Sequence, residues 1–125
     1  MTPITRIGIV AKTRLGAAAG VLVELADWLE ARGITPVFDT DTAALAGGAV
    51  SRRTTSKDDL PLHTDLVVVL GGDGTLIGMA GRIARAQRDI PILGVNFGSL
   101  GFLTEITLPE LYASLESALA GTAQI

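Results

Sequence analysis

An apolar run that ends in a cluster of glycines constrains this 125-residue chain more than any other feature. Leu66 to Leu70 are apolar without alternation and mostly β-branched, which is typical of a central parallel strand covered by helices on both faces. Gly71 to Thr75 follow directly, with three glycines around Asp73, and apolar residues then recur at helical spacing. The sequence therefore predicts a strand, a glycine turn and a helix whose free N–H groups can face an anion.

The Gly71 to Thr75 turn is open to two interpretations. Glycines let the backbone adopt positive φ and let a bulky ligand approach closely, which would place the Asp73 carboxylate at that ligand. Alternatively, Asp73 only caps the following helix and the glycines only make the turn. A Walker-type phosphate loop is excluded, because it needs Gly-Lys-Ser/Thr and neither Lys12 nor Lys57 has that setting.

Composition indicates a single domain and argues against several classes of protein. With 48% hydrophobic and 18% charged side chains, the chain can bury one core. A net charge of −3 argues against a nucleic-acid or anionic-membrane binder, because both need a concentrated basic surface. The chain contains no cysteine, which excludes disulfides and cysteine-ligated zinc. No apolar run has the length of a signal sequence or a membrane span, so we expect a cytoplasmic protein.

The remaining apolar runs predict a Rossmann-like parallel α/β sheet flanked by helices. Besides Leu66–Leu70, the expected strands are Arg6–Ala11, Pro36–Phe38 and Ile92–Val95. The expected helices are Ala17–Arg32, the segment after Thr75, and Thr107 to Gly121. The polar stretch Asp41–Leu60 has no sustained period, so we expect mostly loop there, with a short helix at Thr42–Ala46.

Several charged residues have a functional and a purely solvated interpretation, and the sequence leaves both open. The residues that could meet a phosphate lie in two polar segments: Lys12 and Arg14, then Arg52, Arg53 and Lys57. Three arginines lie off the apolar stripe of one helix and are expected to face water: Arg82, Arg85 and Arg88. His63, the only histidine, precedes the central strand without a metal-ligand set around it.

A second glycine-rich stretch follows the next strand. Asn96 to Thr104 begins where Ile92–Val95 ends, and eight of the fifteen glycines lie between Gly71 and Gly101. Because the carboxyl ends of parallel strands meet at one edge of a sheet, the two glycine-rich loops should lie close together. Their backbone would then be shaped around one bound molecule.

Together the two loops resemble those of the NAD kinase family. Gly-Gly-Asp-Gly-Thr at 71–75 is also close to motifs of diacylglycerol kinases, sphingosine kinases and phosphofructokinases, whereas Asn96 to Thr104 resembles the NAD kinase signature and not the lipid enzymes. The order of elements fits over essentially the whole chain. The resemblance implies a kinase that transfers the γ-phosphate of ATP, or phosphate from polyphosphate, to the 2′-hydroxyl of the adenosine ribose of NAD. It also implies a divalent metal such as Mg²⁺.

The resemblance assigns roles by position and leaves the metal ligands unknown. The residues that should shape the nucleotide site lie in the two loops: Gly72, Asp73, Gly74, Thr75, Asn96, Phe102 and Leu103. Asp73 matches the family's catalytic acidic residue, and Phe102 with Leu103 matches part of an adenine pocket. An aspartate within hydrogen-bond reach of a ribose hydroxyl can accept its proton.

Length is where the chain departs from the family. NAD kinases continue into a largely β domain with an Asn-Glu or Asn-Asp pair for the ribose, whereas Asn96 is the only asparagine here and precedes Phe97. We therefore expect residues 1–120 to form the N-terminal α/β domain and 121–125 to begin a linker to an absent β-rich domain. This chain alone should be inactive, and the full-length protein should be a homo-oligomer. A lipid kinase domain and a non-catalytic adenine-nucleotide sensor remain alternatives.

Overall fold

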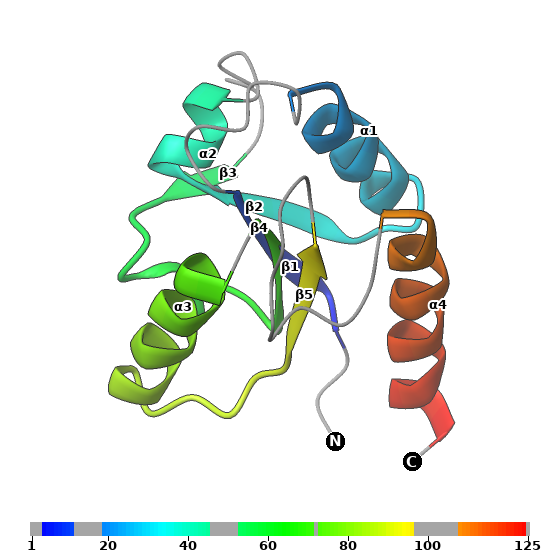
Figure 1. Cartoon of the computed structure of the whole chain (residues 1–125). Coiled ribbons are helices and arrows are strands. Elements are labelled where there is room, and N and C mark those ends of the chain that lie inside the picture. Colours follow the sequence, from blue (N-terminus) through cyan, green and yellow to red (C-terminus); the bar gives the residue numbers. More distant parts are fainter. Residues whose placement is uncertain (1–3, 12–18, 46–52, 72, 97–107, 125) are drawn as a thin grey trace.

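The computed structural model describes residues 4–11, 19–45, 53–71, 73–96 and 108–124, and every structural statement concerns these residues. Five parallel strands form one sheet in the order β3-β2-β1-β4-β5 (Figure 1). The strands are β1 (Arg6–Ala11), β2 (Thr35–Asp39), β3 (Arg53–Thr55), β4 (Leu66–Gly71) and β5 (Ile92–Asn96). The helices are α1 (Ala19–Glu30), α2 (Thr40–Leu45), η2 (Leu60–Leu62), α3 (Asp73–Arg85) and α4 (Leu108–Gln124). The predicted parallel α/β fold is confirmed.

Helices cover both faces of this sheet, with α1 and α4 on one face and α3 on the other (Figure 1). β4 shows why its sequence is apolar without alternation, because every one of its residues is buried. Leu66, Val68 and Leu70 pack into the cluster that includes α1 and α4, while Val67 and Val69 pack into the cluster that includes α3. A strand covered on both faces needs apolar side chains at consecutive positions.

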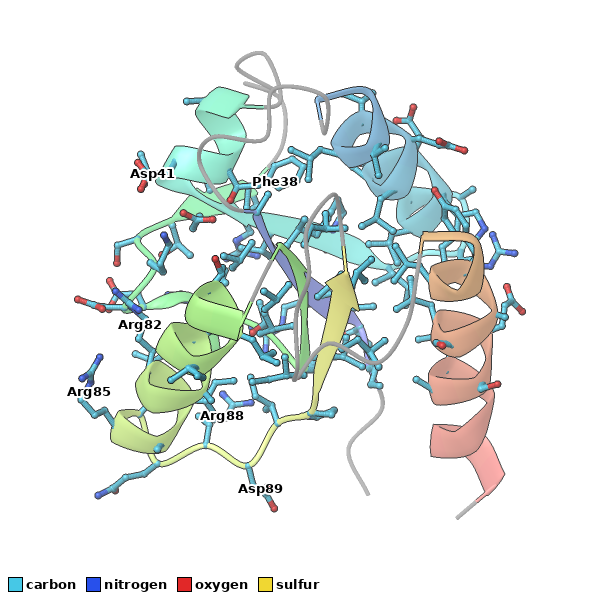
Figure 2. The ribbon with its side chains drawn as sticks, in the orientation of Figure 1. Phe38, Asp41, Arg82, Arg85, Arg88 and Asp89 are labelled. Carbon is cyan, nitrogen blue, oxygen red and sulfur yellow. The ribbon has the colours of Figure 1, made fainter. Side chains whose placement is uncertain are left out.

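The interior also contains Phe38 of β2, which is fully buried and belongs to the cluster that includes α1 and α4 (Figure 2). Trp28 is only partly buried and packs against the same core from α1. Its ring centroid lies 5.1 Å from that of Tyr112 in α4, and the Arg32 guanidinium lies 3.7 Å from the Trp28 ring centroid. These contacts join α1 to α4 over the sheet. Burial, together with the Glu24 carboxylate, raises the pKa of Tyr112.

Several elements differ from the prediction, and three of these differences are informative. The stretch expected to be mostly loop contains β3, a short edge strand that pairs with β2 from Val37↔Arg53 to Asp39↔Thr55. Three largely exposed residues carry too little apolar periodicity to be recognised as a strand. α4 continues to Gln124 through Gly121, where the sequence predicted its end, since one glycine inside a helix costs only about 1 kcal/mol. α3 begins at Asp73, so the turn before it is shorter than Gly71–Thr75.

The strand order reverses between β1 and β4, and we name the carboxyl ends of these two strands the crevice, because a ligand is expected there. After β1 the chain builds β2 and β3 on one side, then crosses to β4 on the other side. Ligands of open α/β sheets bind outside the carboxyl ends of the strands at such a reversal. The carboxyl ends of β1 and β4 lie side by side, with Ala11 paired to Leu70.

Candidate nucleotide site

The two glycine-rich loops of the sequence start from neighbouring strands. Gly71, the last residue of β4, pairs with Asn96, the last residue of β5. Gly71 has a φ of 153°, which residues with a side chain rarely adopt, so the backbone itself requires glycine there. The structure therefore brings the starts of both predicted loops to one edge of the sheet. Gly72, Phe102 and Leu103 lie outside the described residues, as do Lys12, Arg14 and Arg52.

Asp73 is the first residue of α3, so the predicted catalytic residue stands where a long helix meets the crevice. The first N–H groups of a helix have no partner within it, and the helix dipole adds partial positive charge there. That end of α3 can therefore bind a phosphate group. The position suits both sequence interpretations, a helix-terminal aspartate and a carboxylate beside a ligand.

Gly74 gives a reason to favour a ligand. It is exposed in the first turn of α3, and apart from its chain neighbours and the adjacent backbone of α3, a Cβ here would have no heavy atom of the described residues within 4 Å. Helical glycine costs roughly 0.5 to 1 kcal/mol relative to alanine, and neither crowding nor φ accounts for glycine here. The missing side chain leaves open space beside Asp73 that a ligand could fill. Thr75, the next residue, is partly buried.

A buried polar cluster lies at the same edge, and sequence reasoning did not single it out. The Thr42 hydroxyl accepts a hydrogen bond from the Ala11 N–H at 2.9 Å and donates a short one to Asp39 Oδ1. Asp39 is 1% exposed and Thr42 is fully buried. Lys57 Nζ lies 3.8 Å from Asp39 Oδ2 and 3.9 Å from Asp41 Oδ2. Lys57, one of the basic residues that the sequence left open as a phosphate contact, thus lies between two carboxylates.

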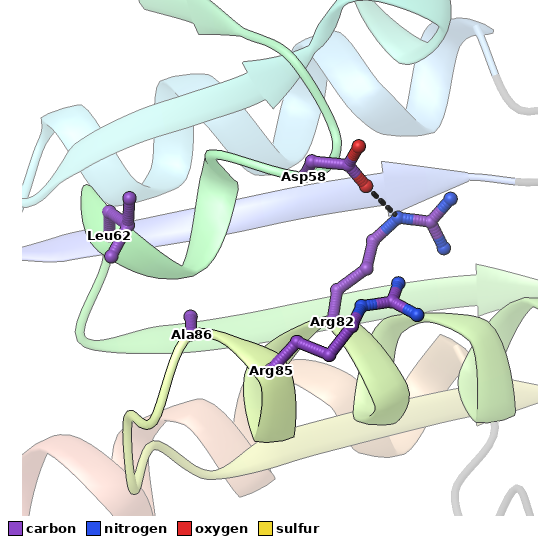
Figure 3. Close-up of a pocket in the computed structure, with 5 residues that line it drawn as sticks. All are labelled: Asp58, Leu62, Arg82, Arg85 and Ala86. Atoms are coloured by element: carbon purple, nitrogen blue, oxygen red, sulfur yellow. Dashed lines mark hydrogen bonds and ion pairs between the residues drawn. The ribbon is translucent and has the colours of Figure 1, made fainter.

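A separate open pocket of about 320 Å³ lies beside the second half of α3 (Figure 3). Its lining residues are Asp58, Leu62, Arg82, Arg85 and Ala86. Arg82 follows Asp73 by nine helical residues, or roughly 14 Å along the helix axis, so this pocket is distinct from the crevice.

The arginines around this pocket correct one sequence expectation. Arg85 is exposed, as predicted, but Arg82 and Arg88 are partly buried and hydrogen-bonded (Figures 2 and 3). Arg82 donates from Nε to Asp58 Oδ1 at 2.9 Å and from Nη1 to the Gly78 carbonyl at 3.1 Å. Arg88 donates from Nη2 to the Thr64 carbonyl at 3.2 Å. The helix pattern could not reveal these partners, because Asp58 and Thr64 are distant in sequence.

The described residues contain no group of three or more His, Cys, Asp or Glu side chains that could hold a metal ion. His63 is part of no such group. Within the same ranges, no helix is long and apolar enough to cross a membrane.

Residues 7–123 match the family described as the ATP-NAD kinase N-terminal domain. The chain belongs to the NAD kinase family. It is 52% identical over 120 residues to the NAD kinase of Geobacter sulfurreducens and 48% identical over 120 residues to that of Geotalea daltonii. Each alignment covers 96% of this chain and 40% of the relative, so the chain spans less than half the length of these NAD kinases.

The fold of this NAD kinase family member is also found in a solved structure. The crystal structure of yeast NADH kinase complexed with NADH has a TM-score of 0.80 and 22% sequence identity to this chain. The alignment covers 96% of this chain and 39% of the yeast chain. At this identity the comparison supports the fold.

Proposed function

We propose that this chain is the N-terminal nucleotide-binding domain of an NAD kinase, an enzyme that transfers the γ-phosphate of ATP to the 2′-hydroxyl of the adenosine ribose of NAD. The observation that carries the proposal is the helix start at Asp73 beside the β1–β4 crevice, within a family match over residues 7–123. The start of α3 offers a phosphate site, and Gly74 leaves room for a bulky ligand.

In the proposed reaction Asp73 is the general base. Its carboxylate accepts the proton of the ribose 2′-hydroxyl as that oxygen attacks the γ-phosphorus of ATP, and ADP leaves with the electrons of the broken bond. Gly72, together with Gly74 and Thr75 in the first turn of α3, holds the nucleotide, and Asn96 opens the second loop. Phe102 and Leu103 contact the adenine. Phosphoryl transfer depends mostly on such placement and on neutralising charge.

A divalent cation, Mg²⁺ by chemical preference, would enter with the phosphates of the donor. Magnesium commonly keeps several waters and uses one or two carboxylates together with substrate phosphates. The described residues offer no cluster of three such ligands of their own. Polyphosphate remains an alternative donor under the same proposal.

We further propose that the full-length protein is a cytoplasmic homo-oligomer in which residues 1–120 form this domain and 121–125 lead toward a β-rich domain. The coverage of 40% of the NAD kinases from Geobacter sulfurreducens and Geotalea daltonii supports a further domain, because their remaining length has no counterpart here. Size-exclusion chromatography with light scattering would test the oligomer.

Replacing Asp73 tests the proposed chemistry. In the full-length protein, Asp73→Asn should keep the fold and lower kcat by roughly a hundred- to ten-thousandfold, because an amide cannot accept the ribose proton. NADP formation from NAD and ATP measures this effect. Asp89→Asn is the matched control, since Asp89 is exposed after α3 and away from the crevice (Figure 2).

A lipid-kinase assay and a nucleotide-binding assay beside this one separate the alternatives. Phosphorylation of diacylglycerol or a sphingoid base instead of NAD would identify a lipid kinase, and nucleotide binding without turnover would identify a sensor. An Asp73→Asn enzyme with wild-type kcat at saturating NAD and ATP would reduce Asp73 to a helix-terminal residue.

A further inference from the structure

The buried polar cluster at the carboxyl edge consists of the Ala11 N–H, Thr42, Asp39 and Lys57, and we call it the Thr42 cluster. It connects separate parts of the chain, because Ala11 ends β1, Asp39 ends β2 and Lys57 follows β3. Thr42 lies in α2, directly after β2. The ends of β1 and β2, α2 and the segment after β3 are therefore joined by the Thr42 hydroxyl and the Asp39 carboxylate beside the crevice.

The hydrogen bond to Ala11 occurs where two strands stop pairing. β1 pairs with β2 from Arg6 to Ile9 but with β4 from Ile7 to Ala11. The Thr42 hydroxyl therefore supplies an acceptor for the Ala11 N–H beyond the end of the β1–β2 ladder, at 2.9 Å. A buried N–H without this acceptor would be left unsatisfied, which proteins avoid.

Asp39 occupies a position that has another use in related folds. In dinucleotide-binding α/β proteins, an acidic residue after the second strand hydrogen-bonds a ribose hydroxyl. Here Asp39 is 1% exposed, its Oδ1 accepts from Thr42, and its Oδ2 faces Lys57. The carboxylate therefore points into the protein and is not available to a ribose.

We propose that Thr42 and Asp39 are positioning residues for the phosphoryl transfer and not substrate ligands; this rests on the proposed function. Their hydrogen bonds hold the end of β1, and Ala11 in turn pairs with Leu70 next to Gly71. Gly71 is two residues before Asp73 and pairs with Asn96. The Thr42 cluster thus fixes the side of the crevice opposite the predicted base.

The decisive comparison is between a Thr42 variant that loses the hydroxyl and one that keeps it. In the full-length protein, Thr42→Val should lower kcat by about a hundredfold, the loss expected for a displacement near 1 Å in a reacting site, with little change in KM for NAD. Thr42→Ser keeps the hydroxyl and should restore kcat. In the 125-residue chain, the Ala11 amide should exchange hydrogen faster in Thr42→Val than in Thr42→Ser.

Thr64→Val is the matched control. Thr64 is also a fully buried threonine with a hydrogen bond, from its hydroxyl to the Leu60 carbonyl at 2.9 Å, but it precedes β4 at the opposite edge. Thr64→Val should lower the melting temperature about as much as Thr42→Val does, but it should leave kcat unchanged.

Three results would overturn the proposal: wild-type kcat in Thr42→Val, an equal loss of kcat in Thr64→Val, or unchanged exchange of Ala11 in Thr42→Val. A wild-type protein that makes no NADP would instead refute the proposed function, while amide exchange would still decide whether Thr42 holds β1.

Discussion

Single side chains fix both ends of the central strands, and Asp65 does so at the edge away from the crevice. Asp65 Oδ2 accepts hydrogen bonds from the N–H groups of Thr5 and Arg6, both at 3.0 Å, and from the Thr5 hydroxyl at 3.2 Å. Arg6 Nη2 lies 3.4 Å from Oδ1. Burial alone would raise the pKa of Asp65, but these donors outweigh it and lower the pKa below its ordinary value. Asp65 thereby joins the start of β1 to the start of β4.

The lowered pKa predicts how stability depends on pH. A carboxyl group with a lower pKa in the folded state stabilises the protein above its unfolded pKa of about 4, and this contribution is lost as pH falls through the folded pKa. Asp65→Asn should therefore cost about 1.5 to 3 kcal/mol near neutral pH and progressively less below about pH 4. Urea unfolding of wild type and variant at several pH values measures this difference. A difference that is constant down to pH 2 would contradict the assignment.

Two glycines of α3 provide a test that separates stability from binding. Gly74 and Gly81 are both exposed, and apart from chain neighbours and the adjacent backbone of α3, a Cβ at either would meet no heavy atom of the described residues within 4 Å. Alanine at either position should stabilise the helix, by roughly 0.5 to 1 kcal/mol at Gly81 and by less at Gly74 in the first turn. Only Gly74→Ala should weaken NAD binding by the full-length protein, because only its Cβ would enter the proposed site. Equal NAD affinity in both variants would show that Gly74 does not contact the ligand.

At the scale of elements, local sequence patterns predicted most of the fold. β4 and β1 are apolar runs, and α1 and α3 carry apolar stripes at helical spacing, so each could be recognised from its own residues. β3 could not, because three polar residues form a strand only through pairing with β2. The end of α4 was missed because glycine is a common but optional helix terminator.

In the candidate site, too, features set by neighbouring residues could be predicted, whereas contacts between residues distant in sequence could not. The glycines around Asp73 predicted that a strand gives way to a helix near this residue, and α3 begins at Asp73. The Thr42 cluster was not predicted, because Ala11 and Thr42 are 31 residues apart and no motif joins them. The role of Asp73 itself stays a prediction.

At the scale of the whole molecule, the described strands form one sheet with the proposed site at its carboxyl edge, and the proposed enzyme needs more than this edge. Correct placement of two reactants can supply on the order of 7 to 11 kcal/mol of barrier reduction, against about 3 to 5 for a general base. Asp73 without the groups that position the ribose therefore has little to act on. We expect the 125-residue chain to be folded, with cooperative unfolding by circular dichroism, but to be inactive by itself. Non-cooperative unfolding would contradict its being a stable domain.

Formation of NADP from NAD and ATP, measured for the full-length protein beside this chain at equal concentration, tests the central claim most directly. The account predicts turnover by the full-length protein and none detectable from residues 1–125, because placement supplies more of the rate than Asp73 does. Failure of the full-length protein to make NADP would contradict the proposed activity. Turnover by this chain within about tenfold of the full-length rate would contradict the need for a second domain.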